Sequence, residues 1–296
     1  MAKINLDKYY TSKELAKYCI DVVNGLGLEI TETIEPSAGN GSFSLQIPNC
    51  IAYDLEPEHE SIIKQDFLKL ELPYKKGRLF IGNPPFGERN ILVKHFYNKC
   101  VDMGDYIAFI LPITQLDNTQ SLYKFNLIYS EDLGVVKYSD RAVHCCFNVY
   151  SRNTDGTLNP KQDYTLKDID IIEYKRSKEV DFDKFDFAVC TWGNGCCGKI
   201  PTHKGQFAQE HYFIIKNDEL RDKILDICNN TDWKNDVAPK NTSSKKIQTW
   251  RIYKYLKEQI PEKKKKKCGG FLFKFFEHKS LIRSTNVALA GNGLQV

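Results

Sequence analysis

The sequence predicts a Rossmann-like α/β fold, a doubly wound and mostly parallel sheet, followed by a smaller C-terminal α+β domain. Two observations predict this. Up to about residue 150, short apolar runs typical of strands alternate with segments of helical spacing, which is the pattern of a parallel sheet covered by helices. The stretch 152–160 is then polar and rich in turn residues. We therefore expect two domains, residues 1–152 and residues 153–296.

The elements of the first domain are expected in the following order. A capping box, Thr11-Ser12-Lys13-Glu14, opens a helix whose apolar residues keep helical spacing to Leu26. A second helix is expected over 90–102, and a third after the glycine loop 39–41. Apolar and β-branched runs indicate strands at 30–34, 51–54, 78–82, 106–111, 133–138 and 143–150. The run 106–111 is apolar, so this strand is expected to be buried on both faces.

The second domain has a less regular pattern. A β-like run is expected at 164–174, a strand at 212–215 and a helix at 218–228. Between the first two lies a glycine-rich loop at 192–199. This loop either enters a groove of a nucleic acid or is a hairpin turn on a packed domain.

Composition argues against membrane, secreted and metal-dependent classes of protein. No apolar stretch approaches the roughly 20 residues that span a bilayer, and the N-terminus lacks the apolar segment of a secretion signal. We therefore expect a cytoplasmic protein, or a nuclear one in a eukaryotic source or host. The cysteines include no C-x-x-C pair, which indicates reduced thiols. No metal is expected either, because ligand spacing is lacking in the one group that could be assembled, His144, Cys145, Cys146, His203 and His211.

Positive charge is concentrated in the second half of the chain. Residues 1–150 contain 15 Lys and Arg against 19 Asp and Glu, whereas residues 151–296 contain 27 against 19. The densest run consists of Lys263, Lys264, Lys265, Lys266 and Lys267. Such a run is either a solvated loop or tail, or a set of phosphate contacts. With Lys199 and Arg251 as further phosphate contacts, the expected partner is a nucleic acid, bound by a monomer or a dimer.

Asn83-Pro84-Pro85-Phe86 directly follows the predicted strand 78–82 and fits the methylation of an exocyclic amine. The nitrogen of such an amine is a poor nucleophile, because its lone pair is delocalised into the ring. An Asn oxygen and a neighbouring carbonyl can accept its two N–H groups and favour a pyramidal nitrogen. Two prolines hold these acceptors rigidly, and an aromatic ring can stack on an extruded base. Taken alone, the tetrapeptide is also consistent with a proline-rich turn after a strand.

Residues at other predicted strand ends indicate a nucleoside site. The loop Gly39-Asn40-Gly41 lets the backbone approach a ligand closely. Asp54 ends the second strand, where an acid can accept both ribose hydroxyls, and Asp66 can accept from an adenine amino group with Phe67 on the ring. The glycine loop continues into neither the dinucleotide nor the phosphate-loop pattern. We therefore expect an adenosine-like ligand without a phosphate cradle.

In this order the motifs resemble those of amino-methyltransferases that use S-adenosylmethionine. More narrowly, the chain resembles N6-adenine DNA methyltransferases whose target recognition domain follows the catalytic domain. The resemblance covers roughly residues 5–150 and rests on Thr11, Glu35-Pro36-Ser37-Ala38-Gly39-Asn40-Gly41, Tyr53-Asp54-Leu55-Glu56-Pro57, Gln65-Asp66-Phe67 and Asn83-Pro84-Pro85-Phe86. It implies a class I methyltransferase fold, base flipping, S-adenosylmethionine as the cofactor, and a place in restriction–modification.

The resemblance also implies which residues contact the cofactor. Besides Asp54 on the ribose and Asp66 on the adenine amino group, it implies contacts for Thr11, Glu35, Ser37, Ala38, Gly39, Gly41, Leu55, Phe67 and Asn83. Of these, Thr11, Glu35 and the glycine loop would surround the methionine moiety.

The target base is implied to meet a second set of residues. Asn83 and the Pro84 carbonyl would hold the amine, with Pro85 stiffening the segment and Phe86 stacking on the base. Phe147 falls where the family places a second aromatic ring, although a phenylalanine in a strand is commonly a core residue.

The expected function is site-specific methylation of adenine N6 in double-stranded DNA by direct, in-line transfer. An RNA N6-adenine methyltransferase is the alternative, because Phe86 stands where Tyr is commoner and Phe is frequent in the related RNA enzymes. The early helix that begins near Thr11 favours the DNA enzymes. A methyltransferase-like binding module without activity is the third possibility.

Overall fold

The computed structural model describes residues 10–138, 142–178, 182, 184–193, 195–238 and 245–260. Their buried apolar side chains form two large clusters, one between residues 16 and 150 and the other between residues 169 and 256. Within this part of the chain, no helix is both long enough and apolar enough to cross a membrane. The predicted boundary at residue 152 lies between the two clusters and stays a prediction.

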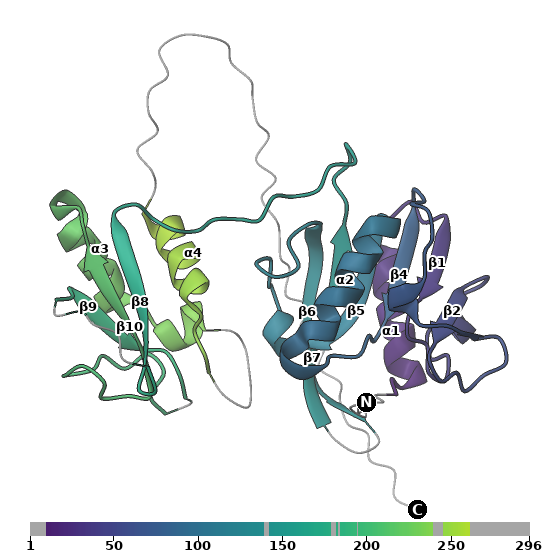
Figure 1. The fold of residues 1–296 in the computed structure, drawn as a ribbon, viewed down its shortest axis with the longest axis horizontal. Coiled ribbons are helices and arrows are strands. Elements are labelled where there is room, and N and C mark those ends of the chain that lie inside the picture. The colour runs from purple at the N-terminus through teal and green to yellow at the C-terminus, as the bar shows by residue number, and fades with distance from the viewer. Residues whose placement is uncertain are drawn as a thin grey trace, which may run out of the picture. The chain divides into compact units, whose positions relative to one another are not determined.

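The first cluster is built on a seven-stranded sheet with the strand order β3-β2-β1-β4-β5-β7-β6 (Figure 1). Its strands are β1 (Glu32–Glu35), β2 (Ile51–Asp54), β3 (Ile63–Lys64), β4 (Arg78–Gly82), β5 (Tyr106–Pro112), β6 (Asn126–Lys137) and β7 (Ala142–Ser151). The first five pair in parallel, and β7 runs antiparallel to both β5 and β6. The predicted fold class, a mostly parallel α/β sheet, is confirmed.

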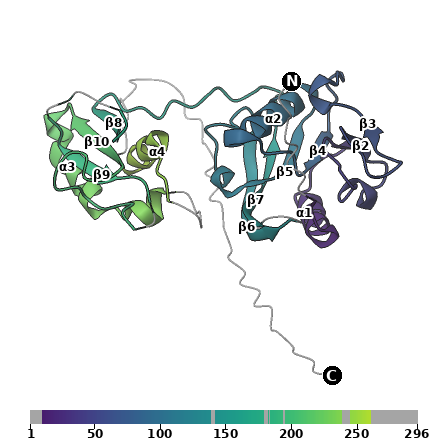
Figure 2. The ribbon, with the colours of Figure 1, turned by 60° about the horizontal axis from the view of Figure 1, so that its bottom comes forward.

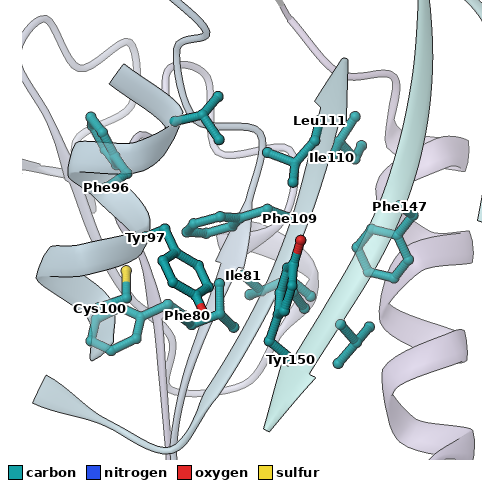
Figure 3. Packing of buried hydrophobic residues seen from close by; sticks show 14 of the residues in the cluster. Phe80, Ile81, Phe96, Tyr97, Cys100, Phe109, Ile110, Leu111, Phe147 and Tyr150 are labelled. Atoms are coloured by element: carbon teal, nitrogen blue, oxygen red, sulfur yellow. The ribbon is translucent and has the colours of Figure 1, made fainter. Parts of the chain in front are cut away.

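Two α-helices cover opposite faces of this sheet, α1 (Lys13–Gly25) and α2 (Ile91–Met103) (Figure 3). Tyr97 and Cys100 of α2 pack on the face that carries Tyr150, with the rings of Tyr97 and Tyr150 5.3 Å apart, edge to face. Phe147 points to the other face, toward α1. β5 is buried over Ile107–Leu111, as its apolar run predicts.

The start of α1 differs from the prediction by one residue. Ser12, not Thr11, is the N-cap, and its side-chain oxygen accepts the backbone N–H of Leu15 at 3.2 Å. Thr11 lies outside the helix, where its carbonyl accepts a hydrogen bond from the Ser42 hydroxyl at 2.6 Å. Because Ser12 is the cap, Thr11 precedes the helix, and its carbonyl joins the start of α1 to Ser42 beside the glycine loop.

The helix expected after the glycine loop is not formed. A short 3-10 turn, η1 (Ser44–Gln46), stands there instead, because Pro48 follows too closely for a longer helix. The loop itself requires glycine: φ is +54° at Gly39 and +80° at Gly41, and a Cβ at Gly41 would lie 2.8 Å from Cγ of Leu45. Three further 3-10 turns are η2 (Phe67–Lys69), η3 (Glu88–Asn90) and η4 (Ile113–Gln115).

The second cluster belongs to a small α+β unit, as predicted (Figure 2). Its antiparallel sheet has the order β8-β10-β9, with β8 (Ile169–Lys175), β9 (Phe187–Cys190) and β10 (Gln209–Ile215). Its helices are α3 (Asp218–Asn230), the π-turn η5 (Trp233–Val237) and α4 (Thr249–Gln259). One core contains Phe213 of β10, Ile224 of α3, Trp233 of η5 and Ile252 of α4. The sequence did not predict β9 or α4.

Candidate cofactor and target-amine site

A cavity of about 240 Å³ opens at the carboxyl ends of β1, β2 and β4. Parallel strands end together at this edge, so their following loops converge there. The cavity is lined by Tyr10, Pro36, Ser37, Gly39, Asp54, Leu55, Glu56, Glu58, Gln65, Asp66, Phe67, Leu68, Asn83, Pro85, Leu92 and Phe96. Four of these described lining residues are carboxylic acids, and none is Lys, Arg or His. Such a lining suits a cationic ligand and disfavours a phosphate.

Asp54 organises the loops around the cavity. One carboxylate oxygen accepts the backbone N–H of Gly39 at 2.7 Å, and the other accepts that of Glu56 at 2.8 Å. Each oxygen has a second lone pair. Asp54 thus shapes the glycine loop and can still accept hydroxyl groups of a ligand.

Glu35 lies beneath the glycine loop and does not line the cavity. Its side chain is 2% exposed and accepts the backbone N–H of Ser44 at 2.7 Å. Burial raises the pKa of its carboxyl to about 7, although the hydrogen bonds to Ser44 oppose this. Ala38, also below the surface, donates its N–H to the Tyr53 carbonyl at 2.9 Å. Both residues support the loop from behind.

Asp66 and Phe67 reach the cavity from the end of β3. Asp66 is the N-cap of η2 and accepts the backbone N–H of Leu68 at 3.0 Å. Phe67 lines the cavity but is itself a core residue, since its ring stacks on Phe96 of α2 with centroids 5.5 Å apart. The apolar floor of the cavity is therefore fixed by α2.

Asn83 stands where β4 leaves the sheet. Its carbonyl accepts a hydrogen bond from the Ser37 hydroxyl at 3.3 Å, and its amide nitrogen donates to the Tyr138 hydroxyl at 3.4 Å. Asn83, Ser37 and Pro85 line the cavity, whereas Pro84 is buried behind them. Asn83 and Pro85 are thus held on the wall of the acidic cavity, and Pro84 between them is buried.

Other residues predicted for the site lie away from the cavity. Thr11 and Gly41 do not line it, and neither does Phe86, which is 7% exposed and belongs to the core cluster. Phe147 is fully buried and packs edge to face on Tyr129, with centroids 6.4 Å apart. Phe147 is therefore a core side chain in this structure, which was the alternative for it.

The predicted phosphate contacts belong to the second unit. Lys199 is exposed at the end of the glycine-rich loop. Arg251 lies on α4 with its guanidinium 4.7 Å from the Trp250 ring centroid, and burial lowers the pKa of Arg251. Lys263 to Lys267 lie outside the described residues.

Several lining residues were not predicted. Tyr10 and Glu58 are joined by a hydrogen bond between the phenol and the carboxylate, and Leu92 and Phe96 come from α2. Tyr138 reaches Asn83 from the end of β6. Only Glu56 and Glu58 had a sequence signal, as acids just after a strand end; the others depend on contacts distant in sequence.

Comparisons with known proteins find distant structural likenesses over about half of the chain. No protein-family model and no curated protein matches the chain. Among solved structures, PH1948 of Pyrococcus horikoshii, proposed to be an RNA methyltransferase, is 14% identical with a TM-score of 0.42, covering 51% of this chain and 90% of PH1948. The modification subunit of a proposed type I restriction enzyme from Vibrio vulnificus YJ016 is 11% identical with a TM-score of 0.39, covering 51% and 46%.

A third match is the tRNA m1G37 methyltransferase of M. jannaschii, with 17% identity and a TM-score of 0.36 over 51% of this chain and 53% of that protein. Likenesses this distant transfer no substrate and no residue role. The class of fold rests on the sheet itself, which has the Rossmann order with one antiparallel strand, β7, inserted before the edge strand β6.

Proposed function

We propose that this chain is an S-adenosylmethionine-dependent methyltransferase that modifies the N6 amine of adenine in DNA. The observation that carries the proposal is the position of Asn83 and Pro85 on the wall of a cavity lined by four carboxylates and no described cationic side chain. S-adenosylmethionine suits this donor set, because it combines an adenosine without phosphates and a positively charged sulfonium. Nucleotides with phosphate groups do not suit it.

The residues around the cavity divide into two groups in this proposal. Asp54, held by two backbone N–H groups, accepts the ribose hydroxyls, and Asp66 accepts the adenine amino group of the cofactor. Gly39 allows close approach, and the Phe67 ring supports the apolar side. Glu35 and Ala38 hold the glycine loop in shape.

The second group of residues contacts the target amine. The Asn83 side-chain oxygen and the Pro84 carbonyl accept its two N–H groups, so the nitrogen lone pair turns toward the methyl donor. When bound, S-adenosylmethionine supplies an electrophilic methyl group on sulfur. The chain contributes alignment, because attack must be in line, and no covalent intermediate with the protein is required. The proton released from the amine passes to water.

RNA is the second candidate substrate, and the residue that favours it is Phe86 in place of the commoner Tyr. One experiment separates the two. Labelled S-adenosylmethionine is incubated with the chain and duplex DNA, structured RNA or protein, and the product is identified by mass spectrometry. N6-methyladenine in DNA is the expected result; label found only in RNA or protein contradicts the first choice.

The role given to Asn83 is tested by Asn83→Ala. The expected result is loss of methyl transfer with cofactor binding still measurable by calorimetry, because the substitution removes an acceptor for the amine and leaves Asp54 and Asp66 intact. A variant that keeps turning over at the wild-type rate contradicts the proposed role. Asn98→Ala is a matched control, since it removes an exposed amide of α2 that does not line the cavity.

A further inference from the structure

Three segments of the second unit meet around Trp192. The chain leaves β9 and turns back, so that Cys190 donates its N–H to the Lys199 carbonyl and Gly198 donates to the Cys190 carbonyl, both at 2.8 Å. On the other side, Trp192 pairs antiparallel with Lys246. We call residues 190–193, 195–199 and 245–247 the Trp192 platform. Its glycines spell G-x-G-x-x-G at 193–198, but the turn opens no helix, so it is not a dinucleotide fingerprint.

The platform is anchored from beneath. Ile247 donates its N–H to the Thr191 carbonyl at 2.8 Å. The ring of His211, fully buried on β10, bonds the Thr191 hydroxyl at 2.8 Å through one nitrogen and the Thr249 hydroxyl at 2.8 Å through the other. Burial lowers the pKa of His211 to about 4, so the ring is neutral at neutral pH. A rigid base is what a contact surface needs, because little entropy is then lost on binding.

The side chain of Trp192 lies outside the buried core of this unit. It is 46% exposed, whereas Trp233 in the core of the same unit is 2% exposed. Lys199 and Lys246 are exposed on the same platform. The surrounding sequence is one-sided in charge: residues 190–209 and 237–257 together contain eight Lys and Arg and no Asp or Glu.

We propose that the Trp192 platform is a DNA-binding surface on which the indole of Trp192 stacks on a nucleobase while Lys199 and Lys246 contact the flanking phosphates. An exposed aromatic ring among lysines matches a base with its two phosphates, since every base has a π-face and every phosphate a negative charge. An apolar protein partner would gain from the ring but not from the lysines. The inference rests on the proposed function and names the surface that holds its substrate.

The test is equilibrium binding of the full chain to a fluorescein-labelled DNA duplex that carries one unpaired, bulged base, because only an unpaired base exposes its face to an indole; binding is measured by anisotropy over a salt series. Trp192→Ala is expected to weaken binding roughly 5- to 150-fold, and Trp192→Phe to weaken it less, because a smaller ring still stacks. Lys199→Ala and Lys246→Ala should each lower the slope of log affinity against log salt by about 1. Lys223→Ala, which removes the same charge from α3, is the matched control.

A second readout guards against misfolding. DNA should quench the emission of the wild-type chain, and the quenching should be lost in Trp192→Phe, whose thermal unfolding is expected to match that of the wild type. Wild-type affinity in Trp192→Ala, or equal effects of Lys199→Ala, Lys246→Ala and Lys223→Ala, would overturn the inference.

The two proposals fail separately. A chain that methylates DNA but binds it independently of Trp192 refutes the platform alone. A chain that binds DNA through Trp192 but transfers no methyl group to it refutes the proposed function and supports the platform.

Discussion

Replacing Glu35 by glutamine should change how the stability of the first unit depends on pH. The carboxyl is 2% exposed, and burial raises its pKa from 4.5 to about 7. The folded state therefore binds this proton more tightly than the unfolded state. The stability contributed by the protonated acid is complete below pH 4.5 and is lost as the pH rises through 7.

The size of the effect follows from the two pKa values. The difference between 4.5 and about 7 corresponds to about 3 kcal/mol at 1.36 kcal/mol per pH unit. The glutamine side chain would be neutral at every pH and can still accept the Ser44 N–H. Between pH 5 and pH 8, Glu35→Gln should thus gain about 2.5 kcal/mol in the free energy of unfolding relative to the wild type.

Urea unfolding without cofactor at pH 5, 6, 7 and 8 measures this difference. Glu71→Gln is the control, because it removes an exposed carboxylate from the same unit. If the stability difference between Glu35→Gln and the wild type is the same at pH 5 and pH 8, the reasoning about the buried acid is refuted.

Two further predictions concern single contacts. Arg152→Ala should destabilise the first unit by about 3 kcal/mol or more in urea unfolding, because it leaves the carboxylate of Asp105, 3.1 Å from the guanidinium and mostly buried, without its cation; an unchanged midpoint contradicts this. Tyr138→Phe should lower kcat about 5- to 10-fold with unchanged cofactor affinity, because the Asn83 amide loses the hydroxyl that orients it. A fall in cofactor affinity instead would assign Tyr138 a merely structural role.

Much of the sheet could be predicted from sequence, because short apolar runs bounded by polar residues leave few other choices. The bounds of β2 and β4 were predicted to the residue. α4 was not, since only Ile252 and Leu256 of its apolar residues are fully buried and lysines obscure the stripe. The helix after the glycine loop was predicted from the general pattern of alternating strands and helices, which Pro48 overrides locally.

The part of the site that lies at the carboxyl ends of the parallel strands could be predicted from the sequence. Asp54 ends β2, Asp66 lies two residues after β3, and Asn83 directly follows β4. Such ends share one edge of a parallel sheet, so their convergence was expected, and all three residues line the cavity. Tyr138 could not be predicted, because its approach to Asn83 depends on how β6 folds back along β7. Phe86 and Phe147 are both buried, and a sequence pattern gives no measure of burial. The contacts predicted for them with the target base stay predictions.

Every residue that lines the cavity lies between positions 10 and 96, before β5 begins. Under the proposed function, the pocket and the DNA-contacting Trp192 platform are thus encoded in stretches of gene that do not overlap. A chimera that exchanges residues 153–260 for those of another enzyme is expected to keep every residue that lines the pocket. Under the proposed function, substitutions in that region would change the DNA-contacting residues and leave those around the methyl donor unchanged.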